Sequence, residues 1–597
     1  MKSIVQVMKW MLAGCIAVGV AGSMPAQVVY QVSGAGDDGS KVAGSLTVTP
    51  AATTSNSPSN VPVTQPAPIH VGAAIICTNP PGSIYPLEGV FVNCHASAFT
   101  DLQLDTASIV WNFGDAGSQY NTLKGFNAAH SYASAGNYTI TLTITLATGQ
   151  VSVASCPVTI AADNRPVTHL ASGASLATLQ SGTCNLLAPG GTFTGPLALS
   201  GKSHIYVGPD AGGGAAPIIT SSNNVQDVAT DGNTTACVVK GLSLTMSDQS
   251  ADACDITGNS VTFLGCTLSN LSDCFNLNQE PVNVLIEGNT VPSANLNTIS
   301  NYFVWLEGKE INVYGNTVPN TVNQSIIRAD APGTSDINIS YNNLAKTTPS
   351  GNTYKSCLTL QWYDYLYAGN NTLTNGPMFT GPLTNVPGSN SSSAASSQNT
   401  ILDSNTLNNS KIGINAESIN TMVCNNVINP PNTYGIFVSS TDTSFPGVTW
   451  QVQNLWIENN TVDSTSIYGG FLFLTDGEAQ NVIMDNNLLV NPDLVIGPAQ
   501  TFYVYVANND LDSFSEIKNN AWGTPASVMS WANGGVFFMN ANQSNNVGCL
   551  TPAEWEKTPL NGGATPMGDV YQFPTLTTTY STTQNGIVYG STLTKGN

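Results

Sequence analysis

The sequence predicts an all-β protein, and three observations carry that prediction. Between about Asn283 and Asn520 one sequence motif repeats, in which an alternating apolar strand is followed by Asn or Gly, then Asn, then Thr or Leu. A shorter segment, Ile69 to Ile160, has its own alternating strand together with aromatic residues and glycines. Charged residues make up only 9% of the 597 residues, a composition that suits a secreted β protein better than a helical cytosolic enzyme.

The repeat predicts a stack of similar units. Each unit contains a strand that cannot bury its apolar face alone, so neighbouring units must pair in parallel. The Asn after each strand suits a turn residue in the left-handed backbone region, and stacked asparagines can form a hydrogen-bonded ladder. The spacings are 27, 27, 28, 34, 21, 34, 27 and 33 residues between Asn289, Asn316, Asn343, Asn371, Asn405, Asn426, Asn460, Asn487 and Asn520.

This pattern resembles the right-handed parallel β-helix of pectate-lyase-like proteins. The resemblance covers residues 163–545 and implies a solenoid, in which each coil contacts only its neighbours. It specifies the fold far better than the chemistry.

A separate module is predicted at residues 69–162. The run Trp111-Asn112-Phe113-Gly114-Asp115 is followed by His130-Ser131-Tyr132, and then by Gly136-Asn137-Tyr138 and an alternating strand. These motifs resemble the PKD domain, an immunoglobulin-like β-sandwich, although Ala116 stands where that family has a glycine. The resemblance implies spacing, adhesion or polymer contact without catalysis, and we expect His130 to be a structural hydrogen-bonding residue.

The two ends of the chain carry no predicted chemistry. Residues 1–26 have two lysines before an apolar run, the pattern of a secretory signal peptide that is too short for a membrane span. Cys15 lies in a lipobox-like sequence, so lipid anchoring at the cell surface is the alternative to simple secretion. Residues 27–68 predict a low-complexity linker, with strands at Val28–Val32 and Ser45–Val48 as the alternative, and residues 546–597 predict a C-terminal cap and tail.

The net charge of −21 limits the partners. Without a basic stripe to neutralise phosphates, nucleic acid and anionic membrane surfaces are unfavourable partners. We expect a monomer without a transmembrane span, whose partner is a polysaccharide or a cell-surface or matrix polymer. The cysteine usage supports export, and Cys254 and Cys274, 20 residues apart, are candidates for a disulfide between neighbouring coils.

Alignment of the coils predicts which side chains face outward. Alternation places Phe275, Leu277, Val304, Leu306, Ile327, Ala329, Leu358 and Leu360 inside, so their neighbours point out. One outer column then holds Asn276, Trp305, Arg328 and Thr359, and the next holds Asn278, Glu307, Asp330 and Gln361.

These columns admit two enzyme chemistries. A lyase acting on a uronic acid polymer needs a base and a cation that neutralises the substrate carboxylate. Arg328, Lys355 and a Ca²⁺ held by Glu307 and Asp330 are candidates for these roles. A glycoside hydrolase instead uses two carboxylates, Glu307 with Asp330 or Asp330 with Asp364. The structural alternative is that Arg328 simply pairs with Asp330 or Glu307 on the surface.

A second surface feature is the dense aromatic run that follows Leu360, in the fourth coil of this group. Gln361, Trp362, Tyr363, Asp364 and Tyr365 are candidates for a sugar-binding platform, because flat rings cover the apolar faces of pyranoses. The alternative is that alternate members fill the core. The sequence thus predicts a secreted polysaccharide lyase or glycoside hydrolase, with a non-catalytic adhesive β-helix as the competing class.

Overall fold

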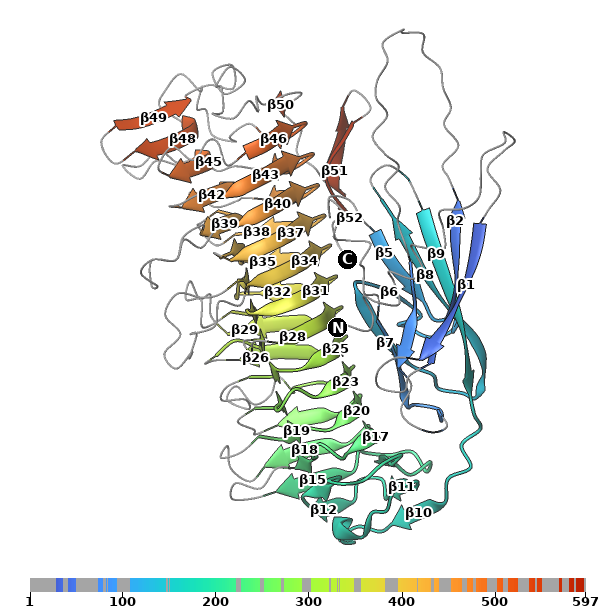
Figure 1. The fold of residues 1–597 in the computed structure, drawn as a ribbon. Coiled ribbons are helices and arrows are strands. Elements are labelled where there is room, and N and C mark those ends of the chain that lie inside the picture. Colours follow the sequence, from blue (N-terminus) through green and yellow to red (C-terminus); the bar gives the residue numbers. More distant parts are fainter. Residues whose placement is uncertain are drawn as a thin grey trace. The chain divides into compact units, whose positions relative to one another are not determined.

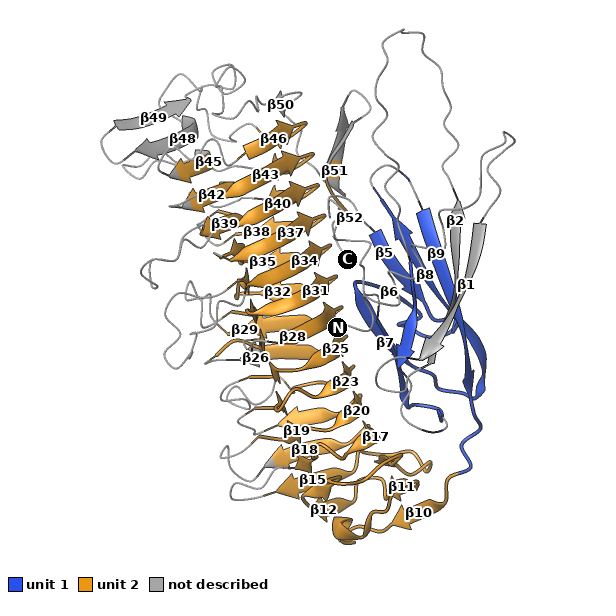
Figure 2. Cartoon of the chain, viewed as in Figure 1, with its two compact units in different colours: residues 1–164 blue, residues 165–597 orange. Residues whose placement is uncertain are grey.

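The computed structural model divides the chain into two compact units, residues 1–164 and 165–597 (Figure 2). The predicted boundary between residues 162 and 163 lies beside this division. The residues that the structure describes are 28–35, 41–49, 73–78, 82, 84–93, 108–146, 149, 151–221, 227–246, 252–269, 273–292, 302–321, 324–329, 331, 333–347, 356–381, 396–415, 417–430, 434–439, 452–463, 470–475, 479–490, 502–507, 514–523, 536–542, 545–549, 569–571, 579–584 and 587–594. The predicted signal peptide and Cys15 lie outside them.

The first unit is an antiparallel β-sandwich. Its strands pair in the order β6-β5-β8-β9-β2-β3-β4-β7, with β1 beside β2 (Figure 1). The strands are β1 (Val28–Ala35), β2 (Lys41–Thr49), β3 (Ile76–Thr78), β4 (Gly89–Asn93), β5 (Ser108–Asn112), β6 (Thr122–Lys124), β7 (Asn127–Ser131), β8 (Gly136–Thr145) and β9 (Val151–Ile160).

Strands β1 and β2 change the interpretation of residues 27–68. The sequence predicts a linker there, but the structure pairs the two strands with each other and pairs β2 with β9. The strand alternative is therefore the one found for 28–35 and 41–49.

The aromatic motif residues form the centre of the sandwich. Trp111, Phe113 and Tyr132 are fully buried, and the indole Nε1 of Trp111 donates to the carbonyl of Gly125 at 2.9 Å. His130 is also buried, and its Nε2 lies 3.0 Å from Oδ2 of Asp115. Burial lowers the pKa of His130, while Asp115 opposes that shift. This geometry fits the structural role predicted for His130.

The second unit is a right-handed parallel β-helix whose coils contribute strands to three long sheets, here named B, C and D (Figure 1). Chain order within a coil runs from D to B to C, and right-handed crossovers are the rule for parallel strands. Sheet B contains β10 (Val167–Leu170), β11 (Cys184–Leu187), β14 (Tyr206–Pro209), β17 (Thr235–Lys240), β20 (Asn259–Leu264), β23 (Val282–Glu287), β25 (Lys309–Tyr314), β28 (Thr334–Ser340), β31 (Tyr363–Gly369), β34 (Ser397–Asp403), β37 (Ser418–Cys424), β40 (Gln453–Glu458), β43 (Gln480–Asp485) and β46 (Phe514–Lys518).

Sheets C and D have shorter strands. Sheet C contains β12 (Thr192–Thr194), β15 (Ile218–Ser221), β18 (Ser243–Met246), β21 (Thr267–Ser269), β26 (Thr317–Thr321), β29 (Asn343–Lys346), β32 (Thr372–Thr374), β35 (Thr406–Asn408), β38 (Val427–Asn429), β41 (Thr461–Asp463), β44 (Leu488–Val490), β47 (Ala521–Trp522) and β50 (Val570–Tyr571). Sheet D contains β13 (Leu197–Ala198), β16 (Val228–Ala229), β19 (Cys254–Ile256), β22 (Phe275–Leu277), β24 (Val304–Leu306), β27 (Ile327–Ala329), β30 (Leu358–Leu360), β33 (Met378–Thr380), β36 (Ile412–Ile414), β39 (Ile436–Ser439), β42 (Leu472–Thr475), β45 (Phe502–Ala507), β48 (Val536–Asn542) and β49 (Asn545–Cys549). The 3-10 helix η2 (Leu176–Thr178) lies between β10 and β11.

The predicted asparagine ladder is present between sheets B and C. Each ladder Asn donates its Nδ2 to Oδ1 of the Asn one coil further on, at 2.9–3.1 Å. The backbone N–H of each donates to the same oxygen, so every turn is fastened twice.

Two details of the ladder differ from the prediction. Asn342, not Asn343, is the ladder member, because Asn343 already begins β29. The left-handed residue is the one before each ladder Asn, with φ between 52° and 67°, and Tyr341 occupies it in that coil. The ladder Asn itself supplies the hydrogen bonds instead of the unusual backbone conformation.

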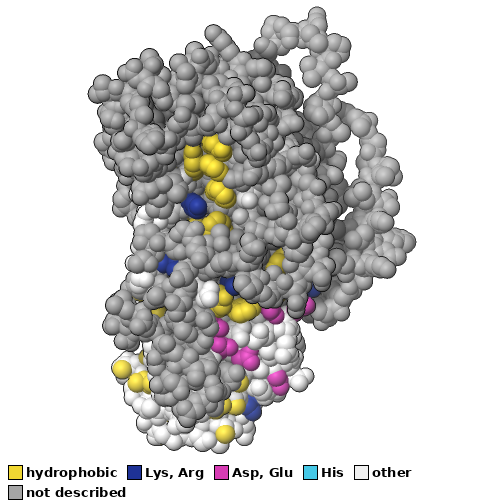
Figure 3. All heavy atoms as spheres, turned by 90° about the vertical axis from the view of Figure 1, so that its left-hand side faces the viewer, with side chains coloured by type: hydrophobic (Ala, Val, Ile, Leu, Met, Phe, Trp, Pro, Cys, Tyr) yellow, Lys and Arg dark blue, Asp and Glu magenta, His cyan; other side chains and the backbone are white. Residues whose placement is uncertain are grey.

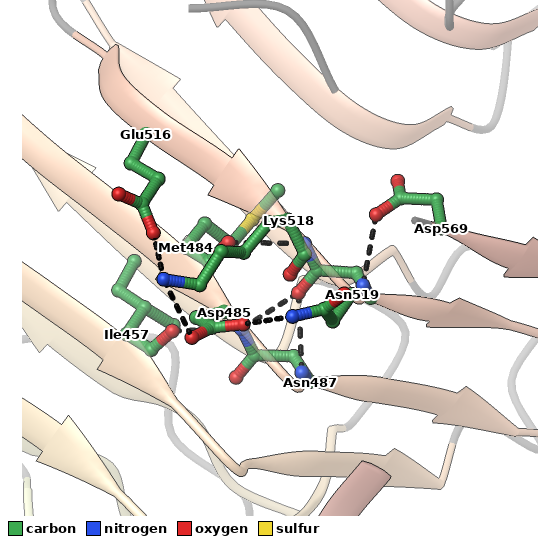
Figure 4. Close-up of polar contacts among 9 residues, drawn as sticks. Ile457, Met484, Asp485, Asn487, Glu516, Lys518, Asn519 and Asp569 are labelled. Carbon is green, nitrogen blue, oxygen red and sulfur yellow. Dashed lines mark hydrogen bonds and ion pairs between the residues drawn. The ribbon is translucent and has the colours of Figure 1, made fainter. Parts of the chain in front are cut away.

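An aspartate ends the ladder at its C-terminal side (Figure 4). Oδ1 of Asp569 accepts from the backbone N–H of Asn520 at 2.8 Å, and Oδ2 accepts from Nε1 of Trp522 at 2.8 Å. Beside it, the Lys518 ammonium pairs with Glu516 and lies 3.4 Å from Oδ2 of Asp485. The carboxylate of Asp569 therefore accepts hydrogen bonds from two N–H groups that would otherwise need acceptors in a further coil.

A C-terminal hairpin packs against the side of the β-helix. Strands β51 (Thr579–Gln584) and β52 (Ile587–Thr594) pair as a hairpin, and Ser591 is fully buried. The backbone N–H of Ser591 donates to Oγ1 of Thr461 at 2.9 Å, and the N–H of Gly590 donates to the carbonyl of Asn486 at 2.7 Å. Part of the segment predicted as cap and tail thus packs along the earlier coils. In the part of the chain that the structure describes, no helix is long and apolar enough to cross a membrane.

Candidate functional site

The outer column predicted for the first coils is present on sheet D. The register pairs Asn276 with Trp305, Trp305 with Arg328, and Arg328 with Thr359. The eight residues predicted to point inward are all fully buried. Alternation along a three-residue strand therefore identified the inward-facing residues of sheet D correctly.

Arg328 and two aromatic rings form a compact cluster in this column. Nη1 of Arg328 donates to the hydroxyl of Tyr302 at 2.8 Å, and the guanidinium carbon lies 5.6 Å from the ring centroids of both Tyr302 and Trp305. The two rings meet edge to face at 5.2 Å. Arg328 is 8% exposed, so its charge is largely removed from water, the condition in which cation–π attraction is strongest.

Trp305 brings a donor to the same cluster. Its Nε1 is buried, and among the described residues it has no hydrogen-bond partner, although the side chain as a whole is partly exposed. A buried N–H without an acceptor costs free energy.

The predicted catalytic groups are only partly described. Glu307 follows β24 directly and is partly exposed. Asp330 and Lys355 lie outside the described residues, so the proposed base and Ca²⁺ ligands remain predictions. No cluster of three or more His, Cys, Asp or Glu side chains able to hold a metal occurs among the residues whose positions are described.

Burial contradicts part of the aromatic platform predicted at residues 361–365. Gln361 is fully buried and Tyr363 is 2% exposed, with its hydroxyl 2.9 Å from Oγ1 of Thr400. Trp362 is 8% exposed and stands at the turn before β31. Tyr363, Asp364 and Tyr365 belong to sheet B, a different sheet from Trp305 and Arg328. Gln361 and Tyr363 therefore cannot contact a polymer.

Asp364 has a structural partner instead. Its Oδ1 accepts from Nδ2 of Asn399 at 2.7 Å, and this bond begins a second polar ladder on sheet B. Asn420, Asn454 and Asn481 each donate to the preceding Asn of this ladder at 2.8–3.1 Å. The two hydrogen-bonded ladders thus flank the same long sheet.

The predicted disulfide between Cys254 and Cys274 is not present. Both are free and fully buried. The register pairs Cys254 with Phe275, so Cys274 stands one residue out of line. Cys274 comes just before β22 (Phe275–Leu277), and both thiols lie in the apolar core of the β-helix without a bond between them.

The same outer column continues into a row of aromatic rings that the sequence analysis missed. Register pairs Phe379 with Gly413, Gly413 with Phe437, Phe437 with Phe473, and Phe473 with Tyr505. The ring centroids are 5.6 Å apart for Phe437 and Phe473 and 4.3 Å apart for Phe473 and Tyr505, with nearly parallel planes. All three rings are partly exposed. We call these three residues the ring column.

Neighbouring residues complete the ring column. The Lys411 ammonium lies 5.1 Å from the ring centroid of Phe437, and burial lowers the pKa of Lys411. Position 413 requires glycine, because a Cβ there would lie 2.2 Å from the Phe379 ring. On the face turned to the viewer, Figure 3 shows a narrow strip of hydrophobic side chains beside Lys or Arg side chains.

The fold and this surface define a two-domain protein, an immunoglobulin-like β-sandwich followed by a right-handed parallel β-helix that carries an aromatic and cationic outer face. Residues 86–160 match the PKD domain family, so the sandwich is a PKD domain. Among solved structures, the chain is similar to the catalytic domain of a GH87 alpha-1,3-glucanase variant in complex with tetrasaccharides. The TM-score is 0.29 and the identity 11%, over 73% of this chain and 91% of that one. The comparison with curated proteins found no match.

Proposed function

We propose that the β-helix binds a polysaccharide along the outer face of sheet D. The observation that carries the proposal is the continuity of one column, in which the Trp305 and Arg328 cluster and the ring column occupy the same register position of successive coils. Successive coils of a parallel stack lie about 4.8 Å apart, so the partly exposed members of this column lie along one line, which suits a linear polymer.

The ring column supplies the apolar part of this surface. Because Phe437, Phe473 and Tyr505 stack on one another, their faces cover each other and their edges form a ridge. The C–H groups of a pyranose can pack against these apolar ring edges, which removes apolar area of both partners from water. The tyrosine hydroxyl adds a polar group at one end of the ridge.

The cations supply the polar part. Arg328 and Lys411 both lie against aromatic rings of this face, in a chain that has only 15 lysines and arginines. Their position favours sugars that carry carboxylates, because each cation offsets the repulsion from a net charge of −21.

Chemistry on the bound polymer is the second candidate. Arg328 is suited to neutralise a uronate carboxylate, and Glu307 follows Trp305 in the same coil. A lyase would use Arg328 with a base such as Lys355 and with Ca²⁺ held by Glu307 and Asp330, whereas a hydrolase would use Glu307 and Asp330 as acid and base. A secreted protein would meet such polymers outside the cell.

The experiment is a parallel assay for binding and turnover. The purified full chain is tested against acidic and neutral polysaccharides of similar length by affinity electrophoresis, with and without Ca²⁺. The same mixtures are examined for unsaturated ends by absorbance and for new reducing ends. Retardation without new chain ends indicates a binding protein. Unsaturated ends together with new reducing ends indicate a lyase, and new reducing ends without unsaturated ends indicate a hydrolase. No retardation and no products across the panel would overturn the proposal.

A further inference from the structure

Two thiols of the PKD domain lie against each other in its interior. The Sγ atoms of Cys77 in β3 and Cys156 in β9 are 3.2 Å apart, and the residues are 79 positions apart in the chain. Each side chain is 4% exposed. A disulfide bond length is about 2 Å, so a shift of about 1 Å would bring the two sulfurs to bonding distance.

The two cysteines come from strands that do not pair with each other. Cys77 pairs with Val92 of β4, and Cys156 pairs with Ile140 of β8. The thiols therefore meet across the interior of the sandwich, between the third and the last of its strands. A bond between them would tie the two ends of residues 76–160 together.

The hydrogen bond between the thiols prepares one of them for reaction. Cys77 donates to Cys156, and this bond raises the pKa of Cys77 and lowers the pKa of Cys156. Cys156 is therefore the first of the two to lose its proton. A thiolate is the form that attacks disulfides.

Cysteines of the β-helix core differ from this pair. The thiols of Cys266 and Cys357 donate to backbone carbonyl oxygens, at 3.8 Å to Leu264 and 3.6 Å to Leu344. Burial raises the pKa of both, to about 11 and about 12. Their surroundings favour the protonated, unreactive thiol, so they serve as internal references for the reactive pair.

We propose that Cys77 and Cys156 form a disulfide bond that closes the PKD domain. The oxidant is a small-molecule or protein disulfide of the kind found in oxidising compartments. The Cys156 thiolate attacks this disulfide and forms a mixed disulfide, with release of one acceptor thiolate. The Cys77 thiolate then attacks the Cys156 sulfur and displaces the second acceptor thiolate. The two thiol protons pass to the two acceptor thiolates, so two electrons leave the protein and the acceptor is reduced.

The burial of both thiols sets when this step happens. A folded sandwich excludes the acceptor disulfide, so exchange occurs while the strands assemble or when the domain opens. Once formed, the bond closes a loop of about 80 residues and restricts the unfolded chain. We therefore expect the oxidised domain to unfold at a higher temperature and at a higher urea concentration than the reduced one.

The test is peptide mapping of the full-length chain, purified without reductant after export to an oxidising compartment and digested after free thiols are alkylated. The expected product is a peptide pair joined through Cys77 and Cys156, absent after reduction, with an intact mass lower by two hydrogen atoms. The chain with Cys94→Ser should give the same pair, since Cys94, which lies outside the described residues, is not the partner. Alkylated Cys77 and Cys156 in the unreduced protein, or a bridge from either to Cys94, would overturn the proposal.

A second measurement does not depend on the fate of any variant. Wild-type protein is melted with and without reductant, and the double variant Cys77→Ala with Cys156→Ala is melted alongside. We expect the reductant to lower the first melting transition of the wild type only. An unchanged transition on reduction would contradict the stabilising role.

Discussion

The guanidinium carbon of Arg328 lies 5.6 Å from the ring centroid of Trp305, its register partner one coil earlier. This relationship joins a scarce cation to an indole whose N–H has no acceptor among the described residues. Both groups point away from the apolar core, since the neighbours of each along its strand are fully buried. The pair therefore defines the polar end of the surface to which we assign polysaccharide binding.

Replacing Arg328 should weaken the binding of acidic polysaccharides. The change Arg328→Gln removes the charge but keeps a donor for Tyr302, so we expect the affinity to fall about tenfold, as cation–π and charge-assisted contacts are worth on the order of 1–2 kcal/mol. Arg328→Lys should recover part of this loss. The measurement is affinity electrophoresis, and equal retardation of wild type and Arg328→Gln would rule out the assigned role.

Removing the middle ring of the column should weaken binding of every sugar polymer. Phe473 contacts both Phe437 and Tyr505, so Phe473→Ala breaks the ridge into two separate rings. We expect about a tenfold loss, in the range measured for aromatic contacts. Tyr341→Asn is the matched control, because Tyr341 is 40% exposed, lies outside the column and has a left-handed backbone that Asn tolerates. A loss of the same size in both variants would argue against the column.

The asparagine ladder should dominate the stability of the coils. Asn371→Ala removes the Nδ2 bonds to Ile339 and Asn405 and the Oδ1 acceptor that serves Asn342. Because these groups are buried, we expect a loss of about 3 kcal/mol, measured by urea unfolding of the β-helix.

The second ladder provides the comparison. Asn454→Gly removes a half-buried ladder member whose φ of 55° a glycine accepts without strain. We expect its effect on the urea midpoint to be clearly smaller than that of Asn371→Ala. Similar midpoints for the two variants would show that burial does not set the strength of these ladders.

Stability should fall as the pH rises from 3.8 to about 7. Asp227 is fully buried, and burial raises its pKa from 3.8 to about 7, against hydrogen bonding to Ser221. The folded state thus holds a proton that the unfolded state loses, so the stabilisation is complete below pH 3.8 and is lost as the pH approaches about 7. The loss is on the order of 4 kcal/mol at about 1.4 kcal/mol per pKa unit.

The variant Asp227→Asn isolates this group. Its melting temperature should fall less between pH 4.5 and pH 7 than that of the wild type, because an amide does not titrate. If the wild type and Asp227→Asn have parallel pH profiles, Asp227 is not the group responsible.

The sequence predicts the β-helix well because its information is local. A strand of alternating residues and a fixed Asn specify which side chains face the core, as at Val304 and Leu306. Where two asparagines are adjacent, as at Asn342 and Asn343, the repeated sequence motif does not predict which of the two joins the ladder. That choice follows from the backbone conformation of Tyr341, which no residue type prescribes.

The candidate site was harder to predict, for two physical reasons. The ring column was missed although each ring stands between two aliphatic residues, because coil lengths vary and the alignment stopped at Gln361. Continuing the same count through Phe437 and Phe473 would have found it. Within the platform, Gln361 and Tyr363 were wrong, since the chain turns from sheet D to sheet B there and carries Tyr363 into the core.

The central claim is that the outer face of sheet D binds a polysaccharide, and affinity electrophoresis of the full chain beside the double variant Arg328→Gln with Phe473→Ala tests it most directly. The account predicts that at least one acidic polysaccharide retards the wild type, that the double variant migrates as it does without polymer, and that Tyr341→Asn behaves as the wild type. Retardation of the double variant equal to that of the wild type would contradict it.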